Sequence, residues 1–314
     1  MKVYEGKEIR NVGLIGHGNS GKTSLAAGIL YLAGVTNRLT RVDEGNTLTD
    51  FDDEEIQRKI TISTALAFAE WNKTKINLLD TPGFNIFIND AKASLVAADS
   101  ALVLVDGVAG VEVQTEKVWS FAADYKLPRA LVINKLDREN ASFDRTLASI
   151  HENFGRTAVP VTLPLGAERE FRGVIDLVQM KAYVYEPGGK GAGKEESIPP
   201  ELAEAAAKAR ETLVEMVAEG NDALMEQFFE NGTLEPEQLV EGLRAAVREM
   251  RLFPVLCASA LNNVGTDCIL NFIVDYFPSP VDRGPVPGKL DGEDVARPVA
   301  DDQPVSAFAF KTVA

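Results

Sequence analysis

Hydrophobic and polar residues alternate along the first half of the chain in a way that separates buried strands from helices. Short apolar runs of strand length are separated by longer segments of mixed polarity, and two of these, residues 22–33 and 89–97, have the character of helices. The strand-like runs cover residues 12–15, 76–79, 101–105, 131–133 and 255–258. This alternation over residues 9–157 predicts an α/β fold with a doubly wound, mostly parallel sheet.

The spacing of these runs also predicts an insertion. About 120 residues separate the runs at 131–133 and 255–258, far more than one crossover helix needs. Shorter strand-like runs lie in this interval at 159–161, 171–178 and 182–185. They precede two helical stripes of apolar residues, which fit core packing better than a partner-binding groove. We predict a small α+β subdomain at residues 158–254, between the first part (1–157) and the last part (255–280) of the main domain.

The end of the chain has a different character. Residues 277–288 contain four prolines and end the main domain, and residues 305–311 alternate as a strand does. Because a lone strand is not stable without neighbours, we expect residues 281–314 to be a linker and the start of a further domain. The chain is then expected to be part of a longer protein.

A glycine-rich loop follows the first strand-like run. Residues 16–23 read Gly-x-x-x-x-Gly-Lys-Thr between a strand and a helix, the context in which this motif binds phosphate and defines a P-loop NTPase. We expect Lys22 to reach the β and γ phosphates and Thr23 to ligate Mg²⁺. The nucleotide-binding residues expected here are His17, Gly18, Asn19, Ser20, Gly21, Lys22, Thr23 and Ser24.

The base is indicated by the loop after the run at 131–133, which reads Asn-Lys-Leu-Asp. The Asp137 carboxylate can accept two hydrogen bonds from N1 and the exocyclic amine of guanine, groups whose donor and acceptor pattern adenine reverses. The Asn134 amide can tie this loop to the phosphate loop, and the Lys135 stem can cover the flat face of the base. Together the two loops predict that GTP and GDP are the ligands.

Three further segments fit the same site. In the loop Asp-Thr-Pro-Gly, Asp80 is expected to hold Mg²⁺ through water and the Gly83 amide to sense a γ phosphate. Thr61 is the candidate for a second hydroxyl on the metal. Backbone amides for the guanine oxygen are expected from Ser259, Ala260 and Leu261. All the loops except the Thr61 segment follow apolar runs, as in the ligand crevice of an open parallel sheet.

Composition restricts the function classes. The chain has 314 residues, 45% hydrophobic and 25% charged, without an apolar stretch of membrane-spanning length or the apolar core of a signal peptide. These features predict a cytoplasmic protein without a membrane partner. The two cysteines, Cys257 and Cys268, are expected to be reduced core thiols. With His17 and His151 as the two histidines, the chain lacks the ligands for a zinc site.

The balance of charge bears on partners. The 47 acidic residues outnumber the 32 basic ones and give a formal net charge of −15. Because a phosphate backbone is approached through clustered Lys and Arg, we expect no binding to DNA and no non-specific binding to nucleic acid by this fragment. A local patch around Lys59 or Arg169 is the alternative route to RNA. The fragment is expected to be monomeric.

The chain resembles the elongation factor G family of translational GTPases over essentially its whole length. The resemblance rests on the loops above, on Asp50-Phe51 ahead of residues 58–62, and on the segments CASAL, Pro-Ser-Pro and QPVSAFAFK. It implies a GTP hydrolase that uses Mg²⁺ and acts with the ribosome, contacting rRNA and stalk proteins. By the same resemblance, the insert corresponds to the subdomain that contacts the stalk, and residues 281–314 include the start of a β-barrel domain II.

Two departures from the family bear on catalysis. Phe84 stands where the family has the His that positions the attacking water, and a phenyl ring offers no donor or acceptor; losing such a group lowers a rate by roughly 10² to 10⁴-fold. The alternative is that Phe84 merely packs beside Phe87. Asn19 replaces an Asp and Lys59 a Gly, and in other GTPases an Asn at this position accompanies K⁺. These departures resemble divergent paralogues of the family. The residues expected at the catalytic centre are Lys22, Thr61, Gly83 and Phe84.

Three functions stay open at this point. The first is a Mg²⁺-dependent GTP hydrolase that promotes translocation or a related step, with switch segments near residues 38–63 and 80–92 that order around the γ phosphate. Its intrinsic rate is expected to be low. The second is a GTP-dependent ribosome-binding or ribosome-protection factor with vestigial hydrolysis. The third is an ATP-using P-loop enzyme.

Overall fold

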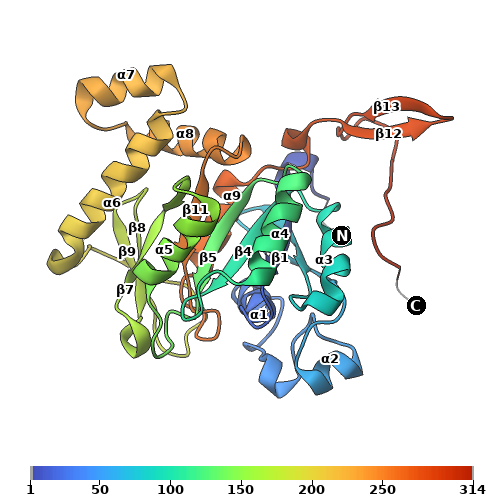
Figure 1. Cartoon of the computed structure of the whole chain (residues 1–314), viewed down its shortest axis with the longest axis horizontal. Helices are drawn as coiled ribbons and strands as arrows, with labels where there is room; N and C mark the ends of the chain where they lie inside the picture. Colours follow the sequence, from blue (N-terminus) through green and yellow to red (C-terminus); the bar gives the residue numbers. More distant parts are fainter. Residues whose placement is uncertain (1–2, 313–314) are drawn as a thin grey trace.

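A seven-stranded sheet forms the centre of the molecule in the computed structural model, which describes residues 3–312 (Figure 1). The strand order is β2-β3-β1-β4-β5-β11-β6; β2 is antiparallel to β3, and all other neighbours in this sheet are parallel. The strands are β1 (Ile9–Gly16), β2 (Ala65–Trp71), β3 (Thr74–Asp80), β4 (Ser100–Asp106), β5 (Arg129–Asn134), β6 (Ala158–Pro160) and β11 (Phe253–Cys257). The predicted mostly parallel sheet is confirmed.

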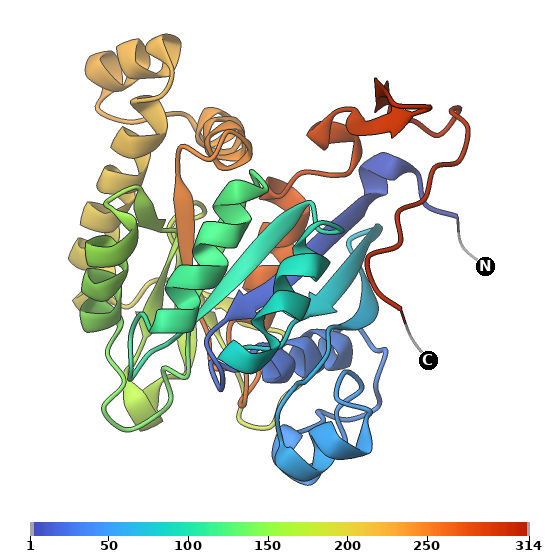
Figure 2. The ribbon, with the colours of Figure 1, turned by 45° about the vertical axis from the view of Figure 1, so that its right-hand side comes forward.

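Helices cover both faces of this sheet (Figures 1 and 2). Helices α3 and α4 pack together on one face, and α1 and α9 pack together on the opposite face. The α-helices of this part are α1 (Lys22–Leu32), α2 (Asp53–Arg58), α3 (Ile88–Leu95), α4 (Val113–Asp124), α5 (Phe143–Phe154) and α9 (Thr266–Tyr276). Short 3₁₀ turns lie at Gly6–Glu8, Val42–Glu44, Asn85–Phe87, Glu168–Glu170 and Val281–Arg283. Because both faces are covered, the middle parts of the central strands are apolar: Leu14 in β1 and Leu102 and Leu104 in β4 have no exposed surface.

The inserted segment forms a second, antiparallel sheet with three helices beside it. The sheet has the order β10-β9-β8-β7. Its elements are β7 (Thr162–Leu165), β8 (Gly173–Asp176), β9 (Lys181–Val184), β10 (Lys194–Glu196), α6 (Pro200–Ala218), α7 (Asp222–Asn231) and α8 (Pro236–Arg248). In α6, Ala206 and Leu213 have no exposed surface, and Leu202, Ala209 and Met216 pack partly buried against the core. The apolar stripe is therefore core packing and not an exposed groove.

The two sheets share one hydrophobic core. A single buried cluster contains Leu14 of β1, Leu104 of β4, Leu213 of α6 and Leu243 of α8. The run around Val159, which was predicted to lie in the insert, forms β6 and pairs with β11 at the edge of the large sheet. A strand that is buried on this edge belongs structurally to the main sheet, although it leads into the insert.

The predicted strand at residues 305–311, near the carboxyl terminus, is not present. Residues 305–311 form no strand; Val305 is 95% exposed, and Phe308 is 68% exposed, so neither has a neighbouring strand to pack on. Instead, β12 (Val286–Leu290) and β13 (Glu293–Arg297) form an antiparallel hairpin. Its two-residue turn is Asp291-Gly292, and both residues have positive φ, the conformation that such tight hairpins require.

The shared core leads to a stability prediction. Replacing Leu213 by Ala should lower the free energy of unfolding by about 2–5 kcal/mol, because a buried side chain is lost and a cavity remains. Urea unfolding followed by circular dichroism should show one transition for both sheets. The matched control is Glu215→Ala, at an exposed position on the same helix. It should change the free energy of unfolding by less than about 0.5 kcal/mol. An early, separate transition in Leu213→Ala would contradict a shared core.

Candidate functional site

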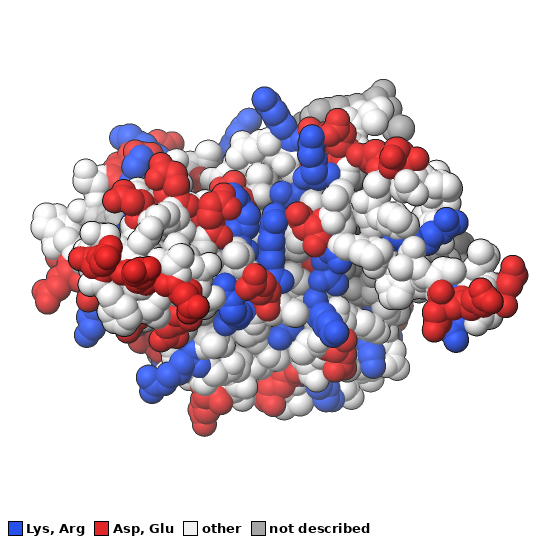
Figure 3. All heavy atoms as spheres, turned by 90° about the horizontal axis from the view of Figure 1, so that it is seen from above, with Lys and Arg blue, Asp and Glu red and all other residues white. Residues whose placement is uncertain are grey.

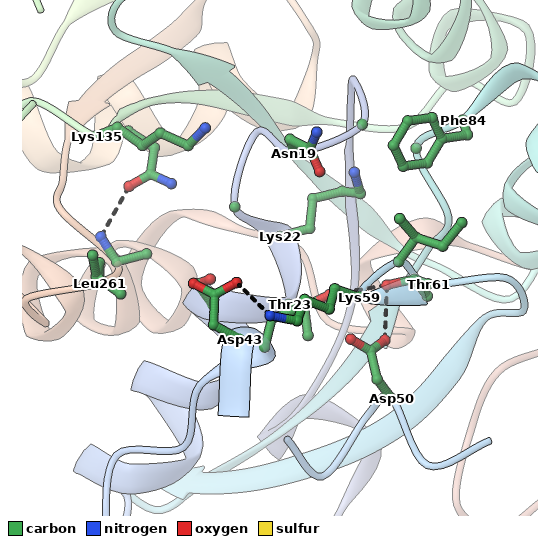
Figure 4. A pocket seen from close by; sticks show the side chains of 18 of the residues that line it. Asn19, Lys22, Thr23, Asp43, Asp50, Lys59, Thr61, Phe84, Lys135 and Leu261 are labelled. Atoms are coloured by element: carbon green, nitrogen blue, oxygen red, sulfur yellow. Dashed lines mark hydrogen bonds and ion pairs between the residues drawn. The ribbon is translucent and has the colours of Figure 1, made fainter. Parts of the chain in front are cut away.

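The carboxyl ends of the parallel strands open into a cleft of about 360 Å³ (Figure 4). The predicted residues that line this cleft are Gly18, Asn19, Gly21, Lys22, Thr23, Ser24, Thr61, Gly83, Phe84, Asn134, Lys135, Asp137, Ala260 and Leu261. Four predicted residues are not part of the lining: Ser20, Asp80 and Ser259 are buried behind it, and His17 is half-buried with its Nε2 3.5 Å from Glu112 Oε1. The structure also places Val42, Asp43, Asp50, Lys59, Ile60 and Arg138 along the cleft, which the motifs did not assign to the nucleotide site.

The phosphate loop is held in shape by backbone geometry and by contacts with neighbouring loops. Gly21 has a φ of 96°, and a Cβ atom there would lie 2.2 Å from the Asn134 side-chain nitrogen, so the position requires glycine. Asn19 has a φ of 65°, a conformation that Asn adopts more readily than most residues. The loop therefore reaches its tight form through residue types that tolerate it.

Lys22 is buried beneath this loop. Its Nζ donates hydrogen bonds to the carbonyl oxygens of His17, at 2.8 Å, and Gly16, at 3.2 Å. Burial lowers the pKa of Lys22 to about 8, while nearby Asp80 and Asp50 oppose that shift. A phosphate group beside Nζ would favour the charged form again. The Ser20 Oγ and the His17 Nδ1 are buried without a hydrogen-bond partner.

A cluster of hydroxyl and carboxyl groups lies beside the start of α1. Thr23 Oγ1 is 3.0 Å from Thr61 Oγ1, which donates to Asp50 Oδ1 at 2.8 Å. Asp80 Oδ2 accepts from Thr49 Oγ1 at 2.8 Å, whereas Asp80 Oδ1 is buried without a partner. Burial, followed by the repulsion from Asp50, raises the pKa of Asp80 to about 6. A cation near the unpaired oxygen would reverse this shift.

These groups fit Mg²⁺ that is bound together with phosphate oxygens. Within residues 3–312 no group of three or more His, Cys, Asp or Glu side chains could hold a metal by itself. Mg²⁺ bound by nucleotide needs few protein ligands, because phosphate oxygens and waters supply the others. Two hydroxyls and one carboxylate, from Thr23, Thr61 and Asp80, agree with that requirement.

The segment that carries Thr61 is fixed from α2. Asp52 caps this helix by accepting a hydrogen bond from the Glu54 amide at 2.9 Å. Glu55, which is 1% exposed, accepts hydrogen bonds from the amides of Ile62, at 2.9 Å, and Ser63, at 3.1 Å. A buried carboxylate therefore holds the chain immediately after Thr61, a contact that no sequence motif indicated.

Asn134 connects three loops of the cleft. Its Nδ2 donates to the Ser20 carbonyl oxygen at 2.8 Å, and its Oδ1 accepts from the Ala260 amide at 2.9 Å. The Ser259 amide donates to the Val264 carbonyl oxygen at 3.0 Å. The amides of Ser259 and Ala260, which were predicted to bind the guanine oxygen, are therefore engaged within the protein. Leu261 lines the cleft.

Asp137 and Lys135 lie at the other end of the cleft. Asp137 Oδ2 accepts from Asn262 Nδ2 at 3.0 Å, and Asp137 Oδ1 is buried without a partner. Lys135 Nζ is 2.6 Å from Asp106 Oδ2, and this contact helps to hold the pKa of Asp106 below its usual value although burial opposes it. Asn262 and Asp106 thus orient the two motif residues. Neither belongs to a motif, so no pattern in the sequence indicated them.

Gly83 and Phe84 close the cleft on the side of the phosphate loop. A Cβ atom on Gly83 would lie 2.3 Å from Lys22 Nζ and 2.7 Å from the Gly18 nitrogen, so this contact also requires glycine. The Phe84 ring lies directly against Gly18, where a Cβ atom would be 2.8 Å from the ring. Phe84 is thus an apolar wall of the cleft next to Lys22 (Figure 4).

The surface charge is unevenly distributed. On the face shown in Figure 3, Lys and Arg side chains form a line down the middle, with a few Asp and Glu side chains among them, and further Asp and Glu side chains lie toward both ends. None of the described helices is both long and apolar enough to cross a membrane. Cys257 in β11 and Cys268 in α9 are free thiols.

This fold and this cleft define a P-loop domain that binds guanine nucleotides. Residues 7–279 match the family described as the elongation factor Tu GTP binding domain, and the chain belongs to this family. It is 39% identical over 317 residues to elongation factor G of Granulibacter bethesdensis, covering 98% of this chain and 45% of that protein. The predicted assignment to the translational GTPases of the elongation factor G family, which are GTP hydrolases, is confirmed.

A solved structure shows the same fold. A crystal structure of a protein from Thermus thermophilus has a TM-score of 0.83 and 36% sequence identity, covering 90% of this chain and 42% of that one. The chain therefore spans less than half the length of the two relatives.

The bridging role of Asn134 can be tested directly. Asn134→Ala removes both hydrogen bonds and leaves a buried amide and carbonyl unpaired, which should lower the free energy of unfolding by about 2 kcal/mol or more. Because the loops are no longer tied, affinity for GDP should fall by about tenfold or more in titration calorimetry. The control is Asn153→Ala, whose exposed amide donates to the Ser149 carbonyl oxygen. Equal effects of the two variants would show that Asn134 is not a special connection.

Proposed function

We propose that this chain binds GTP with Mg²⁺ and hydrolyses it as the GTP-binding domain of an elongation factor G-like factor that acts on the ribosome, in translocation or a related step. The observation that carries the proposal is a pair of buried carboxylate oxygens without hydrogen-bond partners, one in the lining of the cleft and one directly behind it. Asp137 Oδ1 lies at the base end, and Asp80 Oδ1 lies beside the buried Lys22 at the phosphate end.

The residues of the cleft support the individual functions. Asp137 would recognise guanine, Lys22 would neutralise the β and γ phosphates, and the Gly83 amide would contact the γ phosphate. Thr23, Thr61 and Asp80 would hold Mg²⁺, which withdraws charge from the phosphate oxygens when it is bound. Asn19 lines the same cleft, so K⁺ beside the phosphates is part of the proposal. The catalytic contribution of these groups is electrostatic and positional.

The wall formed by Phe84 supports a low intrinsic rate. An attacking water needs a group that accepts its proton or orients it, and the phenyl ring against Gly18 offers neither. This observation also favours a second candidate function. In that function the protein is a GTP-dependent ribosome-binding or ribosome-protection factor, in which nucleotide controls association and turnover is weak.

The partners are proposed from the family and from the surface. We propose that the whole protein contacts rRNA and stalk proteins of the ribosome in the cytoplasm, and that the fragment itself is monomeric. The line of Lys and Arg side chains in Figure 3 supports contact with an anionic partner despite the net negative charge.

The guanine assignment is tested by Asp137→Asn. An amide in place of the carboxylate reverses part of the donor and acceptor pattern, so preference should move from GTP to xanthosine triphosphate by about two orders of magnitude. Competition binding against a fluorescent nucleotide measures the change. Asp144→Asn, exposed on α5, should leave the preference unaltered. An unchanged nucleotide preference in Asp137→Asn would contradict the guanine assignment and favour an ATP-using enzyme.

The two candidate functions separate in single-turnover hydrolysis with and without ribosomes, measured on the full-length protein. If the protein is a working GTPase, ribosomes should accelerate cleavage by several orders of magnitude despite Phe84. In Phe84→His, the rate should rise by roughly 10²-fold or more, because an imidazole can orient water. Phe68→His, an exposed position on β2, is the control. Absence of acceleration by ribosomes would favour the binding or protection factor.

A further inference from the structure

Lys59 occupies an unusual backbone position at the edge of the cleft. It ends α2 with φ 56° and ψ 38°, and its amide donates to the Glu55 carbonyl oxygen. This left-handed conformation suits glycine or asparagine and is unfavourable for a lysine. Because Glu55 fixes the chain just after it, the conformation is set by the surrounding structure. The side chain of Lys59 is thereby directed along the cleft (Figure 4).

The ammonium group of Lys59 has a loose partner. Its Nζ is 3.8 Å from Asp43 Oδ1, and the side chains of Lys59 and Asp43 are 53% and 86% exposed. Such an exposed, long ion pair contributes little to stability. The pair between Lys135, which also lines the cleft, and Asp106 is different, since its atoms are 2.6 Å apart and both side chains are 13% exposed. Lys59 can therefore move away from Asp43 at a small cost in free energy, whereas Lys135 is held in place by Asp106.

Lys59 lies at the phosphate end of the cleft. It lies two residues before Thr61, which contacts Thr23, and it shares the cleft lining with Asn19 and Phe84. The other charged side chains that line the cleft are Lys22, Asp43, Asp50, Lys135, Asp137 and Arg138. Two of these are carboxylates near the phosphate end, Asp43 and Asp50, which would repel a triphosphate. A mobile cation there would offset this repulsion.

We propose that Lys59 exchanges Asp43 for the γ phosphate of GTP and so determines the preference of the site for triphosphate over diphosphate. This inference rests on the proposed binding of guanine nucleotides in the cleft. The terminal phosphate of GTP carries more negative charge than one carboxylate and attracts the ammonium group more strongly. GDP lacks that group, so Lys59 stays with Asp43. Asp43 is then the resting partner of a specificity-determining residue.

The test compares a non-hydrolysable GTP analogue with GDP, each titrated into wild-type protein and variants at low ionic strength. Lys59→Asn and Lys59→Gly both remove the cation and introduce a residue that tolerates the left-handed conformation. Lys59→Gly also removes the whole side chain. Both should bind the GTP analogue about fivefold more weakly and GDP within twofold of wild type. Asp43→Asn should bind the analogue about twofold more tightly, because Lys59 no longer has a competing partner.

The matched control is Arg58→Gln. Arg58 is the preceding cation, it pairs with Glu54 on α2, and it does not line the cleft. Its replacement should leave the ratio of the two affinities unchanged. Thermal melting of Lys59→Asn and Lys59→Gly should occur at or above the wild-type temperature, because the backbone conformation becomes easier. A loss of affinity for the analogue then does not come from unfolding.

The outcomes separate the inference from the proposed function. Equal weakening of both ligands, or no change in either, by Lys59→Asn would overturn the role in triphosphate preference. The second of these results would leave Lys59 as a solvated cation or a contact for RNA. If wild-type protein binds neither ligand, the proposed function itself fails. Rising salt should reduce the preference for the analogue in wild type more than in Lys59→Asn, and equal salt dependence would also contradict the inference.

Discussion

The hydrogen bonds of the Asn134 side chain are the interaction on which the site depends. A parallel sheet brings the carboxyl ends of its strands to one edge, but the loops that follow are free to diverge. Asn134 joins the phosphate loop through the Ser20 carbonyl oxygen and the loop after β11 through the Ala260 amide. The same side chain lies where any Cβ on Gly21 would be placed. One amide thus fixes the distance between the base end and the phosphate end of the cleft.

The phosphate end is organised for ligands of opposite charge. Lys22 and Asp80 are both buried at this end. Burial favours the neutral form of each side chain: it lowers the pKa of Lys22 to about 8 and raises the pKa of Asp80 to about 6. Their mutual attraction does not compensate for the lost hydration. Phosphate favours charged Lys22, and a cation favours charged Asp80. The nucleotide and metal that we propose for this end would therefore stabilise the two charges that the protein alone holds unfavourably.

The sequence predicted the parts of this structure that are local. The phosphate loop, the Asn-Lys-Leu-Asp loop and the buried strands are short motifs with their own geometry, and the family comparison agrees with them. The residues that orient the motifs could not be predicted, because Asp106, Asn262 and Glu55 act through contacts between distant segments and carry no pattern of their own. The prediction of a strand at 305–311 was wrong for a related reason, because alternation of polar and apolar residues indicates a strand only where a neighbouring strand exists to pair with it.

In the proposed function, nucleotide sensing and water activation are separable, because they are assigned to the neighbouring residues Gly83 and Phe84. The position of the loop is set by Gly83, whose close approach to Lys22 and Gly18 depends on the absence of a side chain and not on the residue that follows. In the proposed function, the loop could therefore report on the γ phosphate whichever residue stands at position 84. Handling a proton needs a polar side chain there, and the phenyl ring against Gly18 has none. Since the two functions reside in adjacent residues with different requirements, one can be lost while the geometry for the other persists.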